Sequence, residues 1–422
     1  MTLEEYEIST AATRDARMAW WREAKFGMFI HYGIYSCYGR GEWIKRREGI
    51  TDEEYLETLN TRMTYTPDRA EEWIKCAKAA GMKYAILTTQ HHDGFSLWDS
   101  KDNPYNSVNL GPKRDIVGDF VAACRKHGIG VGLYFSLVNW IHPDGQICKT
   151  DEAARERFLS SVDARLRELM TQYGKIDILW YDVPSPMKNA EEWKSVERNS
   201  MIRELQPGII INDRSRLPED FAVEEDQLKK AHDPGDFEGC MRFSLTAFGG
   251  VDHEKAIPYS MTAHSIVKTM SLCQYAGGNL VFNISPNGDG SIDTYERETL
   301  EQVGKWIEKH SEAVYGASDR APCGANGIST AVRKGGRVYL WNWIWSPIQR
   351  INGYKKAPLS VRCVTTGEAV KFRYERGVLE FLDLPEKCPD DILNFTIFEL
   401  DFGDEVPEYS LIPQNMMQFM NI

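Results

Sequence analysis

The stretch "KYAILTTQHHDGFSLW" (83–98) sets two adjacent histidines and an aspartate directly behind an apolar run. A neutral imidazole is costly to bury without partners, so a histidine pair at the end of a buried strand usually serves hydrogen bonding or chemistry. Two structural histidines with satisfied partners are the alternative. Because Asp93 and Phe95 flank the pair, the pattern favours a binding or catalytic site at His91 and His92.

Carboxylates stand at two further places where a reaction could use them. In "LWYDVPSP" (179–186), Asp182 lies directly beyond an apolar run, as a nucleophile or general base would; a turn or helix-capping aspartate is the alternative. The run "DFAVEEDQ" (220–227) offers Glu224 and Glu225, although charged runs are more often solvated loops. Two carboxylates facing each other would form the acid and the nucleophile or base of a glycosidase.

Metal binding is the first competing interpretation. Adjacent histidines point their side chains apart, and neither H-x-x-x-H nor HExxH occurs in the chain, so no metal is expected, although separate strand ends could still assemble ligands. The stretch "SPNGDGSIDTYE" (285–296) nearly matches a calcium-binding EF-hand loop. However, Ser285 occupies its first position and an expected strand precedes it, so it is interpreted as a strand–helix loop with Asp293 capping the helix.

Short apolar runs alternate with amphipathic stretches along most of the chain. Strands are expected at 26–33, 84–89, 130–136, 176–182, 208–213 and 279–285, and helices at 68–81, 116–128, 152–174, 190–205, 265–278 and 294–310. This alternation indicates a parallel sheet, and the length favours a (β/α) barrel over an open doubly wound sheet. The stretch between 213 and 265 is expected to be irregular.

Polar side chains stand at the end of each of the first five expected strands. Ligands of parallel strand–helix folds gather outside the carboxyl ends of the strands. One mouth should therefore collect His31, His91, His92, Tyr134, Asp182 and Arg214. Flat faces that could stack on sugar rings come from Trp43, Trp98, Trp140 and Trp180. Hydrogen-bonding groups mixed with aromatic rings favour a carbohydrate ligand.

The sequence pattern changes beyond about residue 315. Runs such as "RVYLWNWIW" and "NFTIFELDF" indicate strands and turns without a helical pattern, so a C-terminal β-sandwich is expected. The domain prediction is a catalytic barrel over residues 1–315 and the sandwich over 316–422. The last stretch, "PEYSLIPQNMMQFMNI", has no clear periodicity and carries no prediction.

The composition of the chain restricts which binding partners and which cellular compartment are expected for the protein. The net charge of −12 argues against nucleic acid and anionic membranes, which require clustered Lys and Arg. The nine cysteines are scattered and form no C-x-x-C pair, which is typical of free thiols in a reducing compartment. With neither a signal-peptide pattern nor an apolar run of membrane-spanning length, a cytoplasmic location is expected.

The chain resembles the α-L-fucosidases of glycoside hydrolase family 29, over roughly residues 19 to 310 and more loosely beyond. The resemblance rests on "WWREAKFGMFIHYGIYS", "GEW", "HHDGFSLWDS", "GLYFS", "DILWYD", "INDR" and "GGNLVFNISPNGDG", in that order. It implies exo-acting, retaining hydrolysis of terminal α-L-fucose from oligosaccharides or glycoconjugates, with Asp182 as nucleophile and no cofactor. Implied contacts to the sugar come from His31, His91, His92, Tyr134, Glu42, Trp43 and Arg214. Implied walls for the C6 methyl group are Phe29, Trp180 and Phe248.

The chain departs from the family pattern near the acid. The acid-bearing segment reads "VEEDQ", which aligns Glu225 as the acid/base and leaves Glu224 as an alternative. Val-Pro follows Asp182 where many relatives have Gly-Gly or Gly-Trp, "FGG" (248–250) stands for W-G-Y, and Gln90 for a common Lys. The alternative function is a non-catalytic or altered-specificity carbohydrate-binding relative, for α-L-galactosides or another fucose-like sugar. The oligomeric state carries no prediction.

Overall fold

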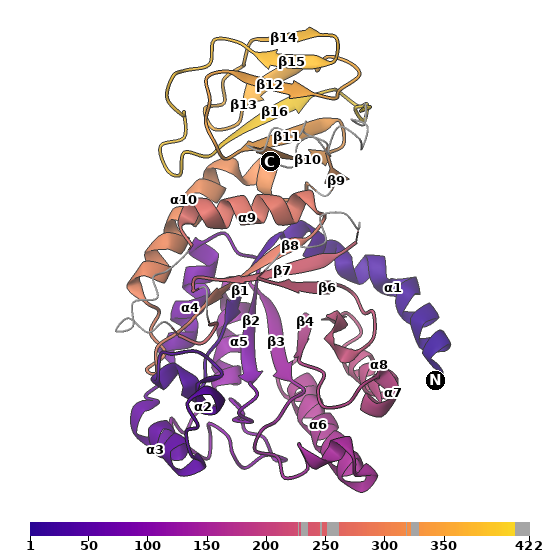
Figure 1. Cartoon of the computed structure of the whole chain (residues 1–422), viewed down its shortest axis with the longest axis vertical. Coiled ribbons are helices and arrows are strands. Elements are labelled where there is room, and N and C mark those ends of the chain that lie inside the picture. Colours follow the sequence, from indigo (N-terminus) through magenta and orange to yellow (C-terminus); the bar gives the residue numbers. More distant parts are fainter. Residues whose placement is uncertain are drawn as a thin grey trace.

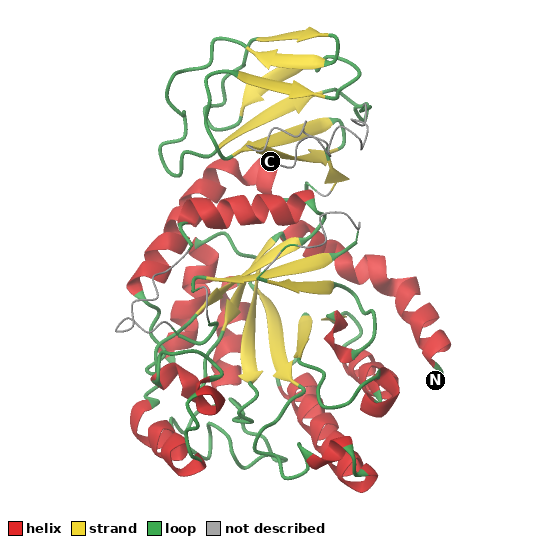
Figure 2. Cartoon of the chain, viewed as in Figure 1, coloured by secondary structure: helices red, strands yellow, loops and turns green. Residues whose placement is uncertain are grey.

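The computed structural model describes residues 1–226, 228, 235–244, 247–250, 261–317, 319–321 and 329–409. A curved sheet surrounded by helices forms the larger part of the molecule, and a smaller all-β part lies beyond one end of it (Figures 1 and 2). Within the described residues, no helix combines the length and the apolar character that crossing a membrane would require.

Eight parallel strands build the central sheet in the order β5-β4-β3-β2-β1-β8-β7-β6. Their bounds are β1 (Phe26–Ile30), β2 (Tyr84–Gln90), β3 (Gly130–Ser136), β4 (Ile178–Asp182), β5 (Ile210–Ile211), β6 (Ala222–Glu225), β7 (Phe237–Arg242) and β8 (Asn279–Ile284). The predicted (β/α) barrel is confirmed, and the open doubly wound alternative is wrong. The irregular stretch expected between 213 and 265 is also wrong in part, because β6 and β7 lie there. Their short, polar sequences lack the apolar run that marked the other strands.

The helices around the sheet largely match the expected ranges. The predicted helices correspond to α4 (Asp68–Ala79), α5 (Ile116–His127), α6 (Glu152–Gln172), α9 (Ala263–Tyr275) and α10 (Thr294–Val314). The single helix expected at 190–205 is divided into α7 (Ala190–Trp193) and α8 (Ser195–Leu205), because Lys194 between them adopts a left-handed conformation with φ of 51°. Among the residues that the structure describes, the α-helices that were not predicted are α1 (Leu3–Ala24), α2 (Ile44–Arg47) and α3 (Asp52–Arg62).

The barrel closes along a seam between β5 and β6. Only a few backbone contacts cross it: Asp213 N donates to Phe221 O at 3.0 Å, and Asp220 N donates to Ile211 O at 2.9 Å. The two strands thus share a single bridge, between Asn212 and Phe221, instead of the continuous ladder of the other strand pairs. Side chains must therefore contribute to holding the two edges together.

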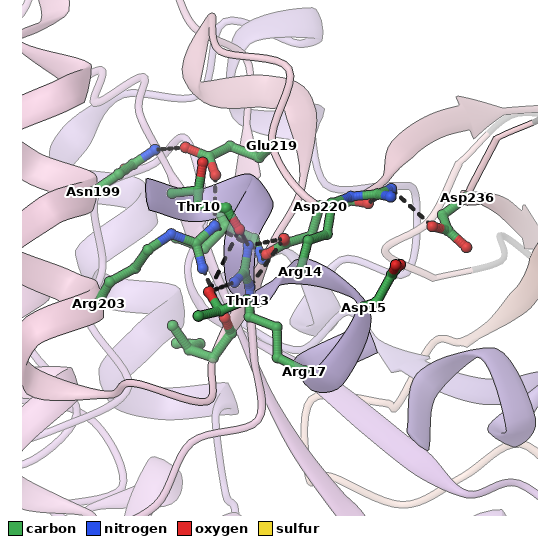
Figure 3. A network of polar contacts seen from close by, with 12 residues as sticks. Thr10, Thr13, Arg14, Asp15, Arg17, Asn199, Arg203, Glu219, Asp220 and Asp236 are labelled. Atoms are coloured by element: carbon green, nitrogen blue, oxygen red, sulfur yellow. Dashed lines mark hydrogen bonds and ion pairs between the residues drawn. The ribbon is translucent and has the colours of Figure 1, made fainter. Parts of the chain in front are cut away.

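An ion-pair network on α1 spans this seam (Figure 3). Arg17 Nη2 contacts Asp220 Oδ1 at 2.7 Å, and both side chains are almost completely buried. Asp220 Oδ2 accepts from Ile211 N at 2.9 Å and from Arg203 Nη2 at 3.0 Å, so one carboxylate ties α1, α8 and both seam edges together. Trp21 of α1 stacks on Phe221 at 5.1 Å and reaches the barrel interior.

The C-terminal part contains two antiparallel sheets, which confirms the predicted β-sandwich. The larger sheet has the order β13-β16-β11-β10-β9 and the smaller one β12-β15-β14. Their bounds are β9 (Asp319–Arg320), β10 (Ser329–Lys334), β11 (Arg337–Asn342), β12 (Gln349–Asn352), β13 (Ser360–Cys363), β14 (Phe372–Glu375), β15 (Val378–Phe381) and β16 (Thr396–Asp401). Trp306 of α10 packs 5.5 Å from Trp341 of β11, which anchors the sandwich to the helices. Of the tail, residues 410–422 lie outside the described residues.

Candidate active site

The carboxyl ends of the barrel strands bring the predicted site residues to one mouth. His31 follows β1, His91 and His92 follow β2, Tyr134 lies in β3, and Asp182 ends β4. Their rings form a continuous cluster: His91 lies 4.1 Å from His92, 5.6 Å from Tyr134 and 5.8 Å from His31, measured between ring centroids. Residues separated by more than a hundred positions in the chain thus line one buried cluster.

Asp182 is buried, and its carboxylate accepts hydrogen bonds from three donors, Tyr134, Arg214 and the Val183 amide. Its Oδ2 accepts from Tyr134 Oη at 2.7 Å and lies 3.7 Å from His92 Nε2, and its Oδ1 accepts from the Arg214 guanidinium. Burial by itself would raise the pKa of Asp182, but the charge of Arg214 and the hydrogen bonds from Tyr134 and Arg214 outweigh burial and leave the pKa below its ordinary value. Asp182 is therefore an ionised carboxylate with fixed orientation, as a nucleophile requires.

The three histidines are neutral at physiological pH. Burial lowers the pKa of His31 to about 3 and that of His92 to about 4, and it lowers the pKa of His91 well below its ordinary value. Ser136 donates its hydroxyl proton to Val138 O at 2.7 Å, so it accepts from His92 Nδ1 at 2.6 Å. That arrangement leaves His92 Nε2 as an acceptor, which suits a ligand hydroxyl.

Glu224 and Glu225 face opposite sides of β6. Glu225 forms an ion pair with Arg214, with Oε2 2.7 Å from Nη2, and its side chain is 38% exposed. Glu224 is buried, and its charge adds to burial in raising the pKa of the Cys273 thiol, on helix α9 outside the sheet. Because neighbouring residues of a strand alternate between faces, only Glu225 lies on the side of Asp182 and the mouth.

Aromatic rings form the floor of the mouth. The Phe29 ring lies 5.1 Å from Trp180 and 4.5 Å from His31, and Trp180 stacks on Tyr134 at 5.6 Å with an interplanar angle of 21°. The Phe248 ring lies 4.9 Å from the His31 ring. Phe29, Trp180 and Phe248 together therefore offer an apolar surface beside the polar ends of the strands.

The first loop contributes Glu42 and Trp43. Glu42 Oε2 accepts from the backbone amides of Phe248 and Gly249 at 2.8 and 2.9 Å, so this carboxylate orients the segment that carries Phe248. Trp43 packs edge-on against His92 at 4.8 Å and stays 37% exposed, which places it on the rim. Glu42 thus has a structural role that its position in the sequence did not suggest.

Sequence reasoning missed two polar residues that organise the mouth. Asn283 of β8 accepts from His31 Nδ1 at 2.6 Å and donates to Phe248 O at 2.8 Å, so it fixes one histidine and one aromatic wall. Glu238 of β7 is fully buried inside the barrel and accepts from Trp180 Nε1 at 3.0 Å; burial raises its pKa to about 7. The signal for Asn283 was present, since it is a polar residue inside the apolar run "NLVFNIS".

The residue after Asp182 carries backbone strain. Val183 has a φ of 40°, a region that favours glycine and penalises a β-branched side chain. A glycine at this position would meet that requirement without cost. Val183 N donates to Asp182 Oδ1 at 2.8 Å, so the strained turn contributes a hydrogen bond to the carboxylate.

His91, His92 and Asp182 could together hold a metal ion. Their potential ligand atoms all lie within 4.8 Å of one another. However, the two Asp182 oxygens already accept from Tyr134 and from Arg214, and the guanidinium charge opposes a second cation.

In the 285–296 loop, Asp293 caps α10 by accepting from Tyr295 N at 2.8 Å, as the sequence predicted.

Comparisons with known proteins agree on one family. The sequence profile described as Alpha-L-fucosidase matches residues 2–312. The tissue alpha-L-fucosidase of Rattus norvegicus is 31% identical over 327 residues, which cover 70% of this chain and 69% of that protein. Alpha-L-fucosidase isoenzyme 1 from Paenibacillus thiaminolyticus superposes with a TM-score of 0.81 at 29% identity, covering 93% of this chain and 100% of that one.

A further similar structure bears on the type of reaction. It is a trapped covalent intermediate of the family 29 alpha-L-fucosidase from Bacteroides thetaiotaomicron in complex with 2-fluoro-fucosyl fluoride, with a TM-score of 0.81, 27% identity, and coverage of 92% of this chain and 96% of that one. A covalent intermediate is the mark of a retaining mechanism. The chain belongs to the alpha-L-fucosidase family, glycoside hydrolase family 29, and is a glycoside hydrolase.

Proposed function

We propose that this retaining α-L-fucosidase removes terminal α-L-fucose from fucosylated oligosaccharides or glycoconjugates, with Asp182 as nucleophile and Glu225 as acid/base. The observation that carries the proposal is the chain of contacts from Asp182 through Arg214 to Glu225. Two carboxylates from β4 and β6 share one guanidinium at the mouth. A retaining glycosidase requires two carboxyl groups on either side of the reacting bond.

In the first step, Asp182 attacks the anomeric carbon while Glu225 donates a proton to the leaving oxygen. Asp182 suits attack because Tyr134 and Arg214 hold its carboxylate ionised and aimed into the mouth. Glu225 must carry a proton when substrate is bound, so its ion pair with Arg214 must be exchanged during binding. Its partial exposure makes that exchange possible.

Arg214 links the two steps electrostatically. When Asp182 becomes a glycosyl ester it loses its charge, and Glu225 has lost its proton at the same moment. The guanidinium, which contacts both carboxylates, can then stabilise Glu225 as the base that activates water. In the free enzyme, its position over the Trp180 ring, 5.1 Å from the centroid, places the guanidinium between the two carboxylates.

The same mouth offers a selective environment for fucose. We propose that the sugar hydroxyls bind to neutral imidazoles and to the rim, and that the C6 methyl group contacts the aromatic floor. The residues proposed for hydroxyl binding are His31, His91, His92, Tyr134, Glu42, Trp43 and Arg214; those proposed for the methyl group are Phe29, Trp180 and Phe248. A sugar with a hydroxyl at C6 would leave that hydroxyl unpaired against an apolar wall, which disfavours galactose-like substrates.

The division of the chain is part of the proposal. We place the catalytic barrel at residues 1–315 and the β-sandwich at 316–422, because α10 ends at Val314 and β9 begins at Asp319. The catalytic and sugar-binding residues proposed above all lie on the barrel side of this boundary. The sandwich then serves to cover helices α9 and α10.

Covalent trapping tests the proposed roles. Incubation with 2-fluoro-fucosyl fluoride should add one fluorofucosyl group to the intact protein, and peptide mapping should place it on Asp182. Asp182→Asn should form no adduct, lose several kcal/mol of transition-state stabilisation, and still bind fucose in calorimetry. A protein that binds fucose but never forms the adduct would support the non-catalytic alternative, and an adduct on another residue would refute the nucleophile assignment.

A further inference from the structure

An aromatic and cationic patch borders the mouth on the β2–β3 side. Trp140, in the loop after β3, lies 5.2 Å from Trp43 and 5.5 Å from His92, and its backbone amide donates to His92 O at 2.8 Å. The patch is therefore continuous with the proposed fucose site and rigidly attached to it. Trp43, with 37% of its surface accessible, and Arg46 are both exposed, whereas Trp140 is half-buried.

Arg46 supplies the charge of this patch. Its guanidinium lies over the Trp140 ring, 4.6 Å from the centroid, which holds it beside the mouth. Among the residues that the structure describes, no carboxylate comes within ion-pair distance of Arg46. Its charge also contributes to lowering the pKa of His92, which places it electrostatically close to the sugar-binding histidines.

Two other arginines near the mouth, Arg214 and Arg242, already form ion pairs with carboxylates. Arg214 pairs with Asp182 and Glu225, and Arg242 Nη1 lies 2.6 Å from Asp226 Oδ1. An anionic group of a bound glycan would gain little there, since each guanidinium would have to give up a carboxylate. Within the described part of the chain, Arg46 has no carboxylate partner to give up, so a ligand anion that binds Arg46 avoids that cost.

We propose that Trp43, Trp140 and Arg46 form a subsite for the second sugar ring of the substrate, and that this ring carries an anionic group. The ring would pack against the exposed face of Trp43 while a sulfate ester or a carboxylate pairs with Arg46. This inference rests on the proposed function, because it assumes that fucose occupies the adjoining pocket. It assigns the enzyme to acidic fucosylated glycans.

The test compares kcat/KM for three matched α-L-fucosyl disaccharides. One has a neutral second sugar, one carries a sulfate ester on that sugar, and one has the corresponding uronic acid. We expect the wild-type enzyme to prefer at least one anionic disaccharide, and the preferred one identifies the anion. Arg46→Met should lower the anionic-to-neutral ratio roughly three- to tenfold, the range for a partly exposed charge-assisted contact.

Arg47→Met is the matched control, because it removes the same charge from the next position of α2. Arg47 Nη2 donates to Arg40 O instead of facing the patch, so this variant should keep the wild-type ratio. Trp140→Leu, which removes the ring under Arg46, should change the ratio in the same direction as Arg46→Met. An unchanged ratio in Arg46→Met, or an equal fall in Arg47→Met, would overturn the subsite.

The outcomes also separate this inference from the proposed function. Wild-type hydrolysis of the neutral disaccharide with no preference for either anion would overturn the subsite alone. Failure of the wild-type enzyme to hydrolyse all three disaccharides and an aryl α-L-fucoside would overturn the proposed function itself. The preference should also weaken as salt is added, because the contact with Arg46 is exposed.

Discussion

Replacing Arg17 with methionine tests how the seam of the barrel holds the acid-bearing strand. Arg17 donates to Asp220 Oδ1 from Nε at 3.1 Å and from Nη2 at 2.7 Å, and the two side chains are only 5% and 1% exposed. Breaking a buried ion pair by removing one partner costs about 3–5 kcal/mol, because a charge is left uncompensated. Since Arg203 and the Ile211 amide still reach Asp220, we expect the lower end, about 3 kcal/mol.

Urea unfolding followed by tryptophan fluorescence measures this loss as a fall in the midpoint. Arg157→Met is the control: its ion pair with Asp144 has a similarly short contact, 2.6 Å, but Arg157 is 59% exposed. Water already solvates that guanidinium, so its removal should leave the midpoint close to that of the wild type. Equal midpoints for the two variants would refute the role assigned to burial.

The same variant should alter catalysis selectively. Asp220 lies two residues before β6, the strand that ends at Glu225, so a looser seam should displace Glu225 relative to Asp182. Substrates with poor leaving groups need protonation and should lose kcat/KM, whereas aryl fucosides with very acidic leaving groups should lose much less. An equal loss on both classes would show that the seam stabilises the fold without positioning the acid.

Three further predictions concern the acid, metals and pH. Glu225→Ala should cripple hydrolysis of natural glycosides but spare the first step on substrates with very acidic leaving groups, while Glu224→Ala should act nearly as wild type on both; the reverse pattern would assign the acid to Glu224. Activity should survive exhaustive chelation, because two carboxylates supply the chemistry; loss with EDTA and recovery with zinc or calcium would contradict this. Burial raises the pKa of Glu296 from 4.5 to about 8, so the folded chain retains a proton that the unfolded chain releases. The protonated Glu296 carboxyl group therefore contributes its full stabilisation below pH 4.5, and this stabilisation is lost as the pH rises to about 8. Glu296→Gln should flatten that part of the stability–pH curve in urea unfolding, and an unchanged slope would refute the assignment.

The sequence by itself determined the positions where chemistry could occur. Asp182 and the pair His91–His92 directly follow apolar runs, and a polar residue at the end of a buried parallel strand lies at the ligand-binding edge whatever the remaining packing. The barrel and the sandwich were predictable for the same reason, since hydrophobic periodicity reports local structure.

Only the tertiary structure decided how these groups act on one another. The sequence left Glu224 and Glu225 open, and the register of β6 turns Glu225 toward Arg214 and Glu224 toward α9. Helix α1, which was not predicted, closes the seam through contacts some two hundred positions away in the chain, such as Arg17 to Asp220. Such contacts depend on where distant segments meet in space, and no local pattern of residue types encodes that meeting.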